Sequence, residues 1–119
     1  MTVKKYPMLI GGEAMTTANT IEVVNPSTEQ VIGQIYNADE SSMHQALAAS
    51  KTGFEKWSSQ TPASRRAVIL KFADRLEEHC QRLIQLLMDE TGKPYENAAY
   101  DFNMLITCLR YFVEEVERL

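Results

Sequence analysis

The 119-residue sequence has little cysteine, and it contains no long hydrophobic run. Its two cysteines, Cys80 and Cys108, are too few for the disulfide framework of a small secreted domain, and they favour reduced thiols. No apolar stretch approaches the roughly 18 residues of a membrane-spanning helix. Residues 1–10 also lack the long apolar core of a signal peptide. We therefore expect a cytoplasmic protein that does not enter a membrane.

Positive charge is also scarce. The sequence has 12 Lys and Arg residues against 16 Asp and Glu, a net charge of −4, and no basic run is longer than two residues. A nucleic-acid-binding face needs clustered Lys and Arg, so we expect no nucleic-acid partner. Hydrophobic residues make up 45% of the chain, which predicts a folded chain of one domain or part of one.

The sequence contains no recognisable catalytic constellation. Neither Gly11-Gly12 nor Gly92-Lys93 matches a dinucleotide-binding fingerprint or a phosphate-binding loop. His79 precedes Cys80 directly, but adjacent residues on a helix do not face each other. We therefore interpret both cysteines as small core residues and predict no catalytic and no cofactor-binding residue.

Residues 1–37 have the pattern of short antiparallel β-strands. Apolar and β-branched residues occur in three runs, at 7–10, 20–24 and 31–36. Gly11-Gly12 predicts a hairpin turn after the first run, because glycine readily adopts positive φ angles. Asn25-Pro26 predicts a turn after the second run, because the residue before proline is excluded from helical conformations.

Residues 38–119 have the pattern of three to four helices. Asp39 and Thr61 are the predicted N-caps of the first two, and Pro62 stands at a first helical position. We expect a break near residues 79–81 and a helix end at Gly92. The fold class is therefore α+β, with a strand segment, 1–37, and a helical segment, 38–119, in a single incomplete domain that spans residues 1–119.

The last predicted helix, from about Tyr95 to Leu119, is apolar on more than half of its circumference. A helix of this kind must be covered on two sides, which indicates a further partner surface. The sequence ends within this helix without a capping residue. One predicted stripe comprises Ala98, Phe102, Leu105, Leu109, Phe112 and Val116, and a second face comprises Tyr100, Met104, Thr107, Cys108 and Tyr111.

A series of short segments follows a characteristic order along nearly the whole chain. They are Leu9-Ile10-Gly11-Gly12-Glu13, Val23-Val24-Asn25-Pro26-Ser27-Thr28, Val31-Ile32-Gly33, Phe54-Glu55-Lys56-Trp57, Thr61-Pro62-Ala63-Ser64-Arg65-Arg66, Leu76-Glu77-Glu78, Glu90-Thr91-Gly92-Lys93-Pro94 and Leu109-Arg110-Tyr111-Phe112. Each motif alone is weak, but the ordered set is specific. It resembles the N-terminal segment of the NAD(P)-dependent aldehyde dehydrogenases.

The resemblance implies that the chain is one part of a larger enzyme. Members of the family are several times longer, and their catalytic cysteine, general-base glutamate and cofactor-binding segments lie beyond the part that this chain resembles. The family oxidises an aldehyde to a carboxylic acid with NAD or NADP through a cysteine thioester. We therefore expect the 119-residue chain alone to be inactive, to need no cofactor, and to supply packing and one wall of the substrate tunnel.

The resemblance also implies two sets of site residues. Tyr100, Asp101 and Met104 correspond to a helix face that lines the substrate tunnel, and the apolar Met104 favours an apolar or aromatic aldehyde. The alternative is that these are plain packing residues. A backbone oxygen of Val23 or Val24 and the carboxylate of Glu90 resemble ligands of a structural monovalent cation, since hard cations prefer oxygen. For Glu90 the alternative is a simple surface carboxylate.

The expected partner is the remainder of an aldehyde dehydrogenase chain. A second hypothesis is a free-standing helical interaction module, derived from the enzyme fold, that self-associates through the last helix. A third is a modifier that docks on a full-length enzyme.

Overall fold

The computed structural model describes residues 3–115. Within it, the chain forms two compact units, Met1–Ser59 and Gln60–Leu119, and each is described by itself. The strands end at Tyr36 and the first helix begins at Glu40, and the α+β class is confirmed. The assignment of residues 1–119 to one incomplete domain stays a prediction.

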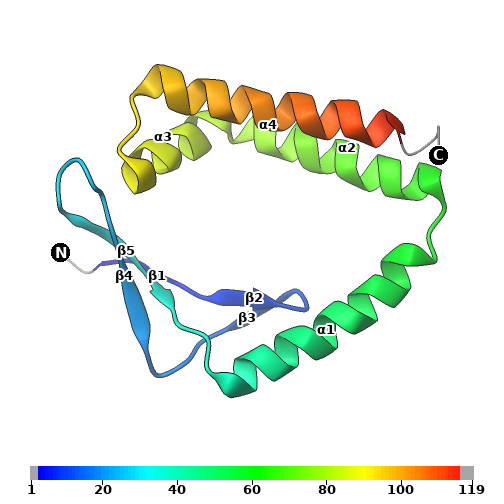
Figure 1. The fold of residues 1–119 in the computed structure, drawn as a ribbon, viewed down its shortest axis with the longest axis horizontal. Helices are drawn as coiled ribbons and strands as arrows, with labels where there is room; N and C mark the ends of the chain where they lie inside the picture. The colour runs from blue at the N-terminus through cyan, green and yellow to red at the C-terminus, as the bar shows by residue number, and fades with distance from the viewer. Residues whose placement is uncertain (1–2, 116–119) are drawn as a thin grey trace. The chain divides into compact units, whose positions relative to one another are not determined.

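The first unit contains five short strands and one helix. They are β1 (Lys5–Tyr6), β2 (Met8–Ile10), β3 (Glu13–Met15), β4 (Thr20–Val24), β5 (Val31–Tyr36) and α1 (Glu40–Ser58), as Figure 1 shows. The strands form a three-stranded sheet in the order β1-β5-β4 and a separate two-stranded β2-β3 hairpin. The β2-β3 and β4-β5 pairs are antiparallel, the strand direction predicted for this segment, but the three predicted runs did not include β1 or β3, and β1 pairs with β5 in parallel.

Both predicted turns are present. Gly11 and Gly12 connect β2 to β3 with φ angles of 61° and 90°, in the region that favours glycine. After β4, the side-chain Oδ1 of Asn25 accepts hydrogen bonds from the backbone N–H groups of Ser27 (2.8 Å) and Thr28 (3.2 Å). The side chain of Asn25 therefore stabilises the turn by accepting hydrogen bonds from the backbone of the residues that follow it.

Helix α1 begins at its predicted cap. Oδ1 of Asp39 accepts hydrogen bonds from the backbone N–H of Ser42 (2.8 Å) and from its hydroxyl (2.6 Å), and these bonds lower the pKa of Asp39. The tip of the β2-β3 hairpin lies against α1, where a Cβ added to Gly11 would be 3.4 Å from Ala49. The small side chains of Gly11 and Ala49 thus allow the hairpin tip to approach α1 closely.

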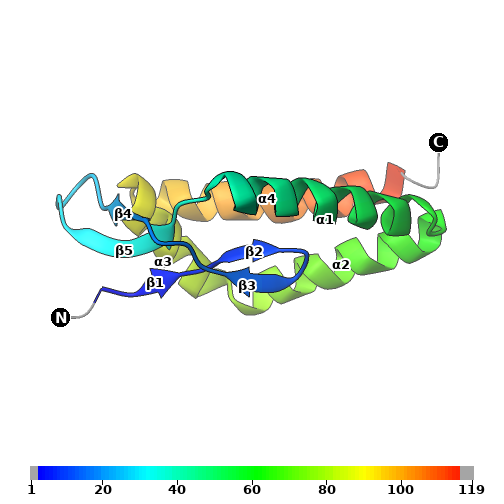
Figure 2. The same cartoon turned by 90° about the horizontal axis from the view of Figure 1, so that it is seen from below.

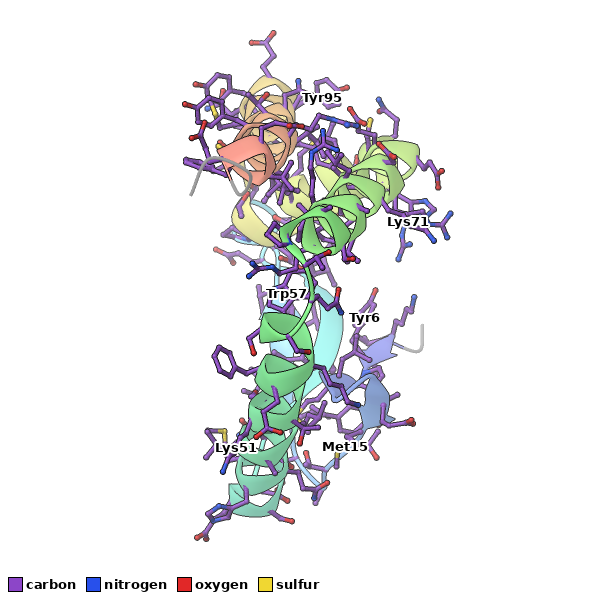
Figure 3. All side chains as sticks on the ribbon, turned by 90° about the vertical axis from the view of Figure 1, so that its right-hand side faces the viewer. Tyr6, Met15, Lys51, Trp57, Lys71 and Tyr95 are labelled. Atoms are coloured by element: carbon purple, nitrogen blue, oxygen red, sulfur yellow. The ribbon has the colours of Figure 1, made fainter. Side chains whose placement is uncertain are left out.

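The large apolar side chains of α1 are exposed. Met43, Leu47 and Phe54 are 54%, 63% and 68% exposed. Trp57, in the last turn of α1 in Figure 3, is 37% exposed. In the described part of the first unit, the buried residues are Gly33 and Ser42.

The second unit is a three-helix arrangement. Its helices are α2 (Pro62–Glu78), α3 (Cys80–Thr91) and α4 (Tyr95–Glu115). Thr61 caps α2, the break falls at His79, and Gly92 ends α3 with a φ of 70°, all as predicted. Helix α4 runs back along both α2 and α3, as Figures 1 and 2 show.

The core of this unit lies between α3 and α4. Ile84, Ala98, Phe102 and Ile106 are buried together, with half-buried residues of α2 and α3 packed around them. The predicted α4 stripe is partly wrong, because Leu105 (45%) and Phe112 (64%) are exposed, whereas Ile106 and Val113 are buried. Val116 and Leu119 of the predicted helix lie outside the described residues.

Ion pairs join α2 to α4 at the surface. Arg66 Nη2 lies 2.5 Å from Glu114 Oε1, and Arg110 Nη2 contacts Asp74 Oδ1 (2.8 Å) and Glu77 Oε2. Arg110 donates these hydrogen bonds to the carboxylates of Asp74 and Glu77, and the bonds raise the pKa of Arg110, which is charged in any case. Among residues 3–115, no helix is long and apolar enough to cross a membrane.

Candidate functional site

The predicted tunnel residues lie on the outward surface of α4. Tyr100 (64% exposed) and Met104 (43%) are one helical turn apart and share a face. Ala98, Phe102 and Ile106 of the same helix are buried in the core, so α4 has one face packed within its own unit and one exposed face. Further along, Tyr111 (60%) packs edge-to-face on Phe112, with ring centroids 5.2 Å apart. The exposed face is thus apolar and aromatic.

Asp101 stands between Tyr100 and Met104 in sequence, and it has a cationic partner. The Lys93 ammonium forms an ion pair and hydrogen bond with Asp101 Oδ2. Lys93 precedes Pro94 in the short connection between α3 and α4, eight residues before Asp101. The sequence predicts a helix end at Gly92 in this connection but not the ion pair that Lys93 forms. The sequence feature that could have predicted this ion pair is a lysine just before the start of α4 and an aspartate within the helix, eight residues later.

The two cysteines are free, and both are half-buried. Cys80 packs against the core cluster of the second unit, in agreement with its interpretation as a small core residue. Its Sγ accepts a weak contact, 3.8 Å, from the Gln81 side-chain amide. Residues 3–115 contain no group of three or more His, Cys, Asp or Glu side chains that could hold a metal ion.

The predicted cation ligands are on separate elements. Val23 and Val24 lie in β4, at a step where the pairing with β5 is irregular: Val23 pairs with Gly33, and Val24 with Val31. Such a bulge interrupts the hydrogen-bond ladder locally. Glu90 is exposed near the end of α3. The cation site stays a prediction of the resemblance.

Two open hollows flank the hairpin tip in the first unit, with volumes of about 180 Å³ and 540 Å³. The larger is lined by Gly11, Ala48, Ala49, Thr52, Gly53 and Lys56. None of the predicted site residues lines either hollow. The surface of α4 is therefore the better candidate for a functional role.

Comparison with known proteins places these elements in one class of α+β enzyme. A 1-pyrroline-5-carboxylate dehydrogenase of Bacillus subtilis is 31% identical over 98% of this chain and 23% of its own length. A solved variant of an aldehyde dehydrogenase from Bacillus cereus is 33% identical, with a TM-score of 0.87 over 94% of this chain and 24% of that one. A betaine aldehyde dehydrogenase from Staphylococcus aureus, solved with NAD+, is 26% identical, with a TM-score of 0.86 over 95% of this chain and 23% of that one.

The aldehyde dehydrogenase family profile matches residues 14–119. The chain belongs to this family, as the ordered motifs predicted. It spans about a quarter of the length of the relatives it matches. The elements described above are therefore a part of the aldehyde dehydrogenase fold.

Proposed function

We propose that this chain serves as the N-terminal quarter of an NAD(P)-dependent aldehyde dehydrogenase and forms one wall of its substrate tunnel. The observation that carries the proposal is the two-sided character of α4. Its inner face holds the core, and its outer face exposes Tyr100 and Met104. The chain matches the family over only about a quarter of the relatives' length. In this proposal, the rest of the enzyme chain packs against the outer face of α4.

In this proposal, the chain's residues shape the path of the aldehyde rather than react with it. The parent enzyme oxidises the aldehyde to a carboxylic acid through a cysteine thioester, with NAD or NADP taking the hydride. Tyr100 and Met104 contact the aldehyde's substituent and exclude water from it. Asp101 and its ion-pair partner Lys93 together set the charge of the wall. Correct positioning of the substrate is worth several kcal/mol of the barrier in well-oriented reactions.

A chimaera tests the proposal. Residues 1–119 replace the matching segment of the Bacillus cereus enzyme, which is 33% identical to this chain. We expect NADH or NADPH formation from an aldehyde, and we expect the Met104→Trp variant to raise KM for bulky aldehydes more than for acetaldehyde. The Val68→Trp variant is the control, because Val68 is also exposed but belongs to α2 and not to α4. A folded chimaera without dehydrogenase activity would contradict the proposal.

The 119-residue chain alone is proposed to be inactive and to bind no cofactor of its own. The test is to measure NADH and NADPH formation with the purified chain and a panel of aldehydes, with the chimaera as the positive control. Turnover by the chain alone would refute this part. We place the protein in the cytoplasm, in keeping with its free cysteines.

The exposed apolar side chains of α4 also favour a second candidate, a helical interaction module that pairs with a copy of itself. Sedimentation of the chain distinguishes the two. A stable dimer that is lost in the Tyr100→Asp variant would favour the module. A monomer that binds hydrophobic dyes would favour the first candidate, part of an aldehyde dehydrogenase, because its exposed apolar face would then be covered by the rest of the enzyme and not by a second copy.

A further inference from the structure

The connection between α3 and α4 fixes the start of the Lys93 side chain. Gly92 closes α3 in the left-handed conformation, and its N–H donates to Met88 O (2.8 Å). On the other side, Pro94 begins the hydrogen bonding of α4, since its carbonyl accepts from the N–H groups of Asn97 and Ala98 (both 3.1 Å). Proline also restricts the backbone of the residue before it. Lys93 therefore leaves a defined junction between two helices.

From this junction, Lys93 reaches forward along α4 to Asp101. Both side chains remain partly in solvent, 43% exposed for Lys93 and 40% for Asp101. An ion pair at such a position contributes little to stability. Its consequence is for charge: the ammonium compensates the carboxylate of Asp101, which follows Tyr100 in sequence and precedes Met104 by three residues, about one helical turn.

The cancelled charge determines what this face attracts. A free carboxylate beside an aromatic ring and a thioether would favour a cationic substituent, by Coulomb attraction and by contact with the ring. With Lys93 in place, an approaching cation meets a carboxylate whose charge is compensated and an ammonium that repels it. An uncharged substituent is indifferent to both and contacts Tyr100 and Met104 directly.

We propose that Lys93 is a specificity-determining residue that neutralises Asp101, so that the tunnel wall accepts aldehydes with uncharged substituents and discriminates against ammonium aldehydes. This inference rests on the proposed function, because it concerns the same wall. Lys93 acts through Asp101 and does not take part in the chemical step.

The test uses the Bacillus cereus chimaera and two aldehydes of the same shape. Betaine aldehyde carries a trimethylammonium group, and 3,3-dimethylbutanal carries a tert-butyl group in its place. The measured quantity is the ratio of kcat/KM for the charged aldehyde to that for the neutral one. This ratio cancels general losses of activity or stability, which a purely structural role of Lys93 would produce.

We expect the Lys93→Met variant to raise this ratio on the order of tenfold, or ~1.4 kcal/mol of differential transition-state binding. The Lys93→Arg variant keeps the positive charge and should keep the ratio of the parent chimaera. Asp101→Asn combined with Lys93→Met should return the ratio towards that of the parent, because the freed carboxylate is then absent. Lys93 is partly exposed, so these variants should fold, which circular dichroism checks.

Failure of the inference differs from failure of the proposed function. An active chimaera whose ratio is the same in Lys93→Met and in the parent overturns the role of Lys93 and leaves the tunnel wall intact. A rise that persists in the double variant also overturns it, because the effect then does not pass through Asp101. A folded chimaera inactive on both aldehydes overturns the wall itself and this inference with it. The same exchange into the Staphylococcus aureus enzyme provides a second scaffold if the first fails to fold.

Discussion

The two compact units of this chain differ in what they bury. The second unit buries six apolar side chains among its residues 60–115, whereas the described part of the first buries only Gly33 and Ser42. The six are Ala73, Ile84, Ala98, Phe102, Ile106 and Val113. The second unit therefore has a core of its own. The first is organised by strand pairing, turns and a helix cap, and it leaves large apolar side chains of α1 exposed.

This difference teaches that secondary structure and independent stability are separate properties. Backbone hydrogen bonds alone contribute little net free energy, because the unfolded chain makes similar bonds with water. Burial of apolar surface supplies most of the favourable free energy of folding. We therefore expect the second unit to be the more stable one, and the first to depend on surfaces that cover α1.

Separating the units would give the largest effect. A peptide of residues 60–119 should be helical and unfold cooperatively, because it retains the core between α3 and α4. A peptide of residues 1–59 should show no cooperative transition, because no apolar side chain is buried among its residues 3–59. Circular dichroism during thermal unfolding measures both. A cooperative transition in residues 1–59 alone would contradict the comparison.

Within the full chain, the core residue Phe102 should matter most. Phe102 is 7% exposed and packs with Ile84, Ala98 and Ile106. The Phe102→Ala variant should lose about 3–5 kcal/mol of the free energy of unfolding, from lost burial and the cavity left behind.

The matched control for Phe102 is Phe54→Ala in α1, where the ring is 68% exposed. This change should alter the free energy of unfolding by no more than about 0.5 kcal/mol. Urea titration of both variants measures the difference. Equal losses of unfolding free energy in the two variants would show that Phe54 is buried in solution. That result would contradict the contrast between the two units.

Two glycines of the first unit should have opposite effects. Gly12 has a φ of 90°, so Gly12→Ala places a side chain in a strained conformation and should cost about 1–2 kcal/mol. Gly53 lies inside α1 with open space around an added Cβ, so Gly53→Ala should stabilise the helix by about 0.5–1 kcal/mol. Amide hydrogen exchange of β2, β3 and α1 reads each effect locally. A loss at both positions would show that α1 is packed more tightly than described.

The smallest expected effect is a pH dependence that distinguishes the helix caps of the two units. The pKa of Asp39 is lower in the folded state than its ordinary value of 3.8. Its cap therefore stabilises α1 above that value, and the contribution is lost as the pH falls through the folded pKa. The hydroxyl of Thr61, which caps α2, does not titrate. Amide shifts of Ser42 and Ser64 followed into acid should thus change only at Ser42, and a change of equal size at Ser64 would contradict this account.

The local features of the fold were predictable because neighbouring residues determine them. The caps at Asp39 and Thr61, the Gly11-Gly12 turn and the end at Gly92 each depend on a few adjacent residues, and all are present. The parallel β1-β5 pair was missed, because a two-residue strand has no pattern of its own and its partner is about 30 residues away along the chain.

Periodicity was less informative where a helix is apolar all round. In α4, Leu105 and Phe112 are as apolar as Ile106 and Val113, so composition could not decide which pair faces the core. For the candidate site, the spacing of Tyr100 and Met104 placed them on one face correctly. The pairing of Lys93 with Asp101 depends on the geometry of the connection before α4, which no periodic pattern encodes.

The arginine contacts between α2 and α4 bear on the order in which the chain folds during synthesis. Arg66 and Glu114 are 48 positions apart, and Arg110 and Asp74 are 36 apart. The β4-β5 hairpin pairs residues at most 16 positions apart, from Thr20 to Tyr36. On the ribosome, the hairpin can therefore close while α2 is still being made, whereas the helical unit must wait until α4 has emerged. Until then, the apolar faces of α2 and α3 are exposed, and this is the interval in which a chaperone would have most to bind.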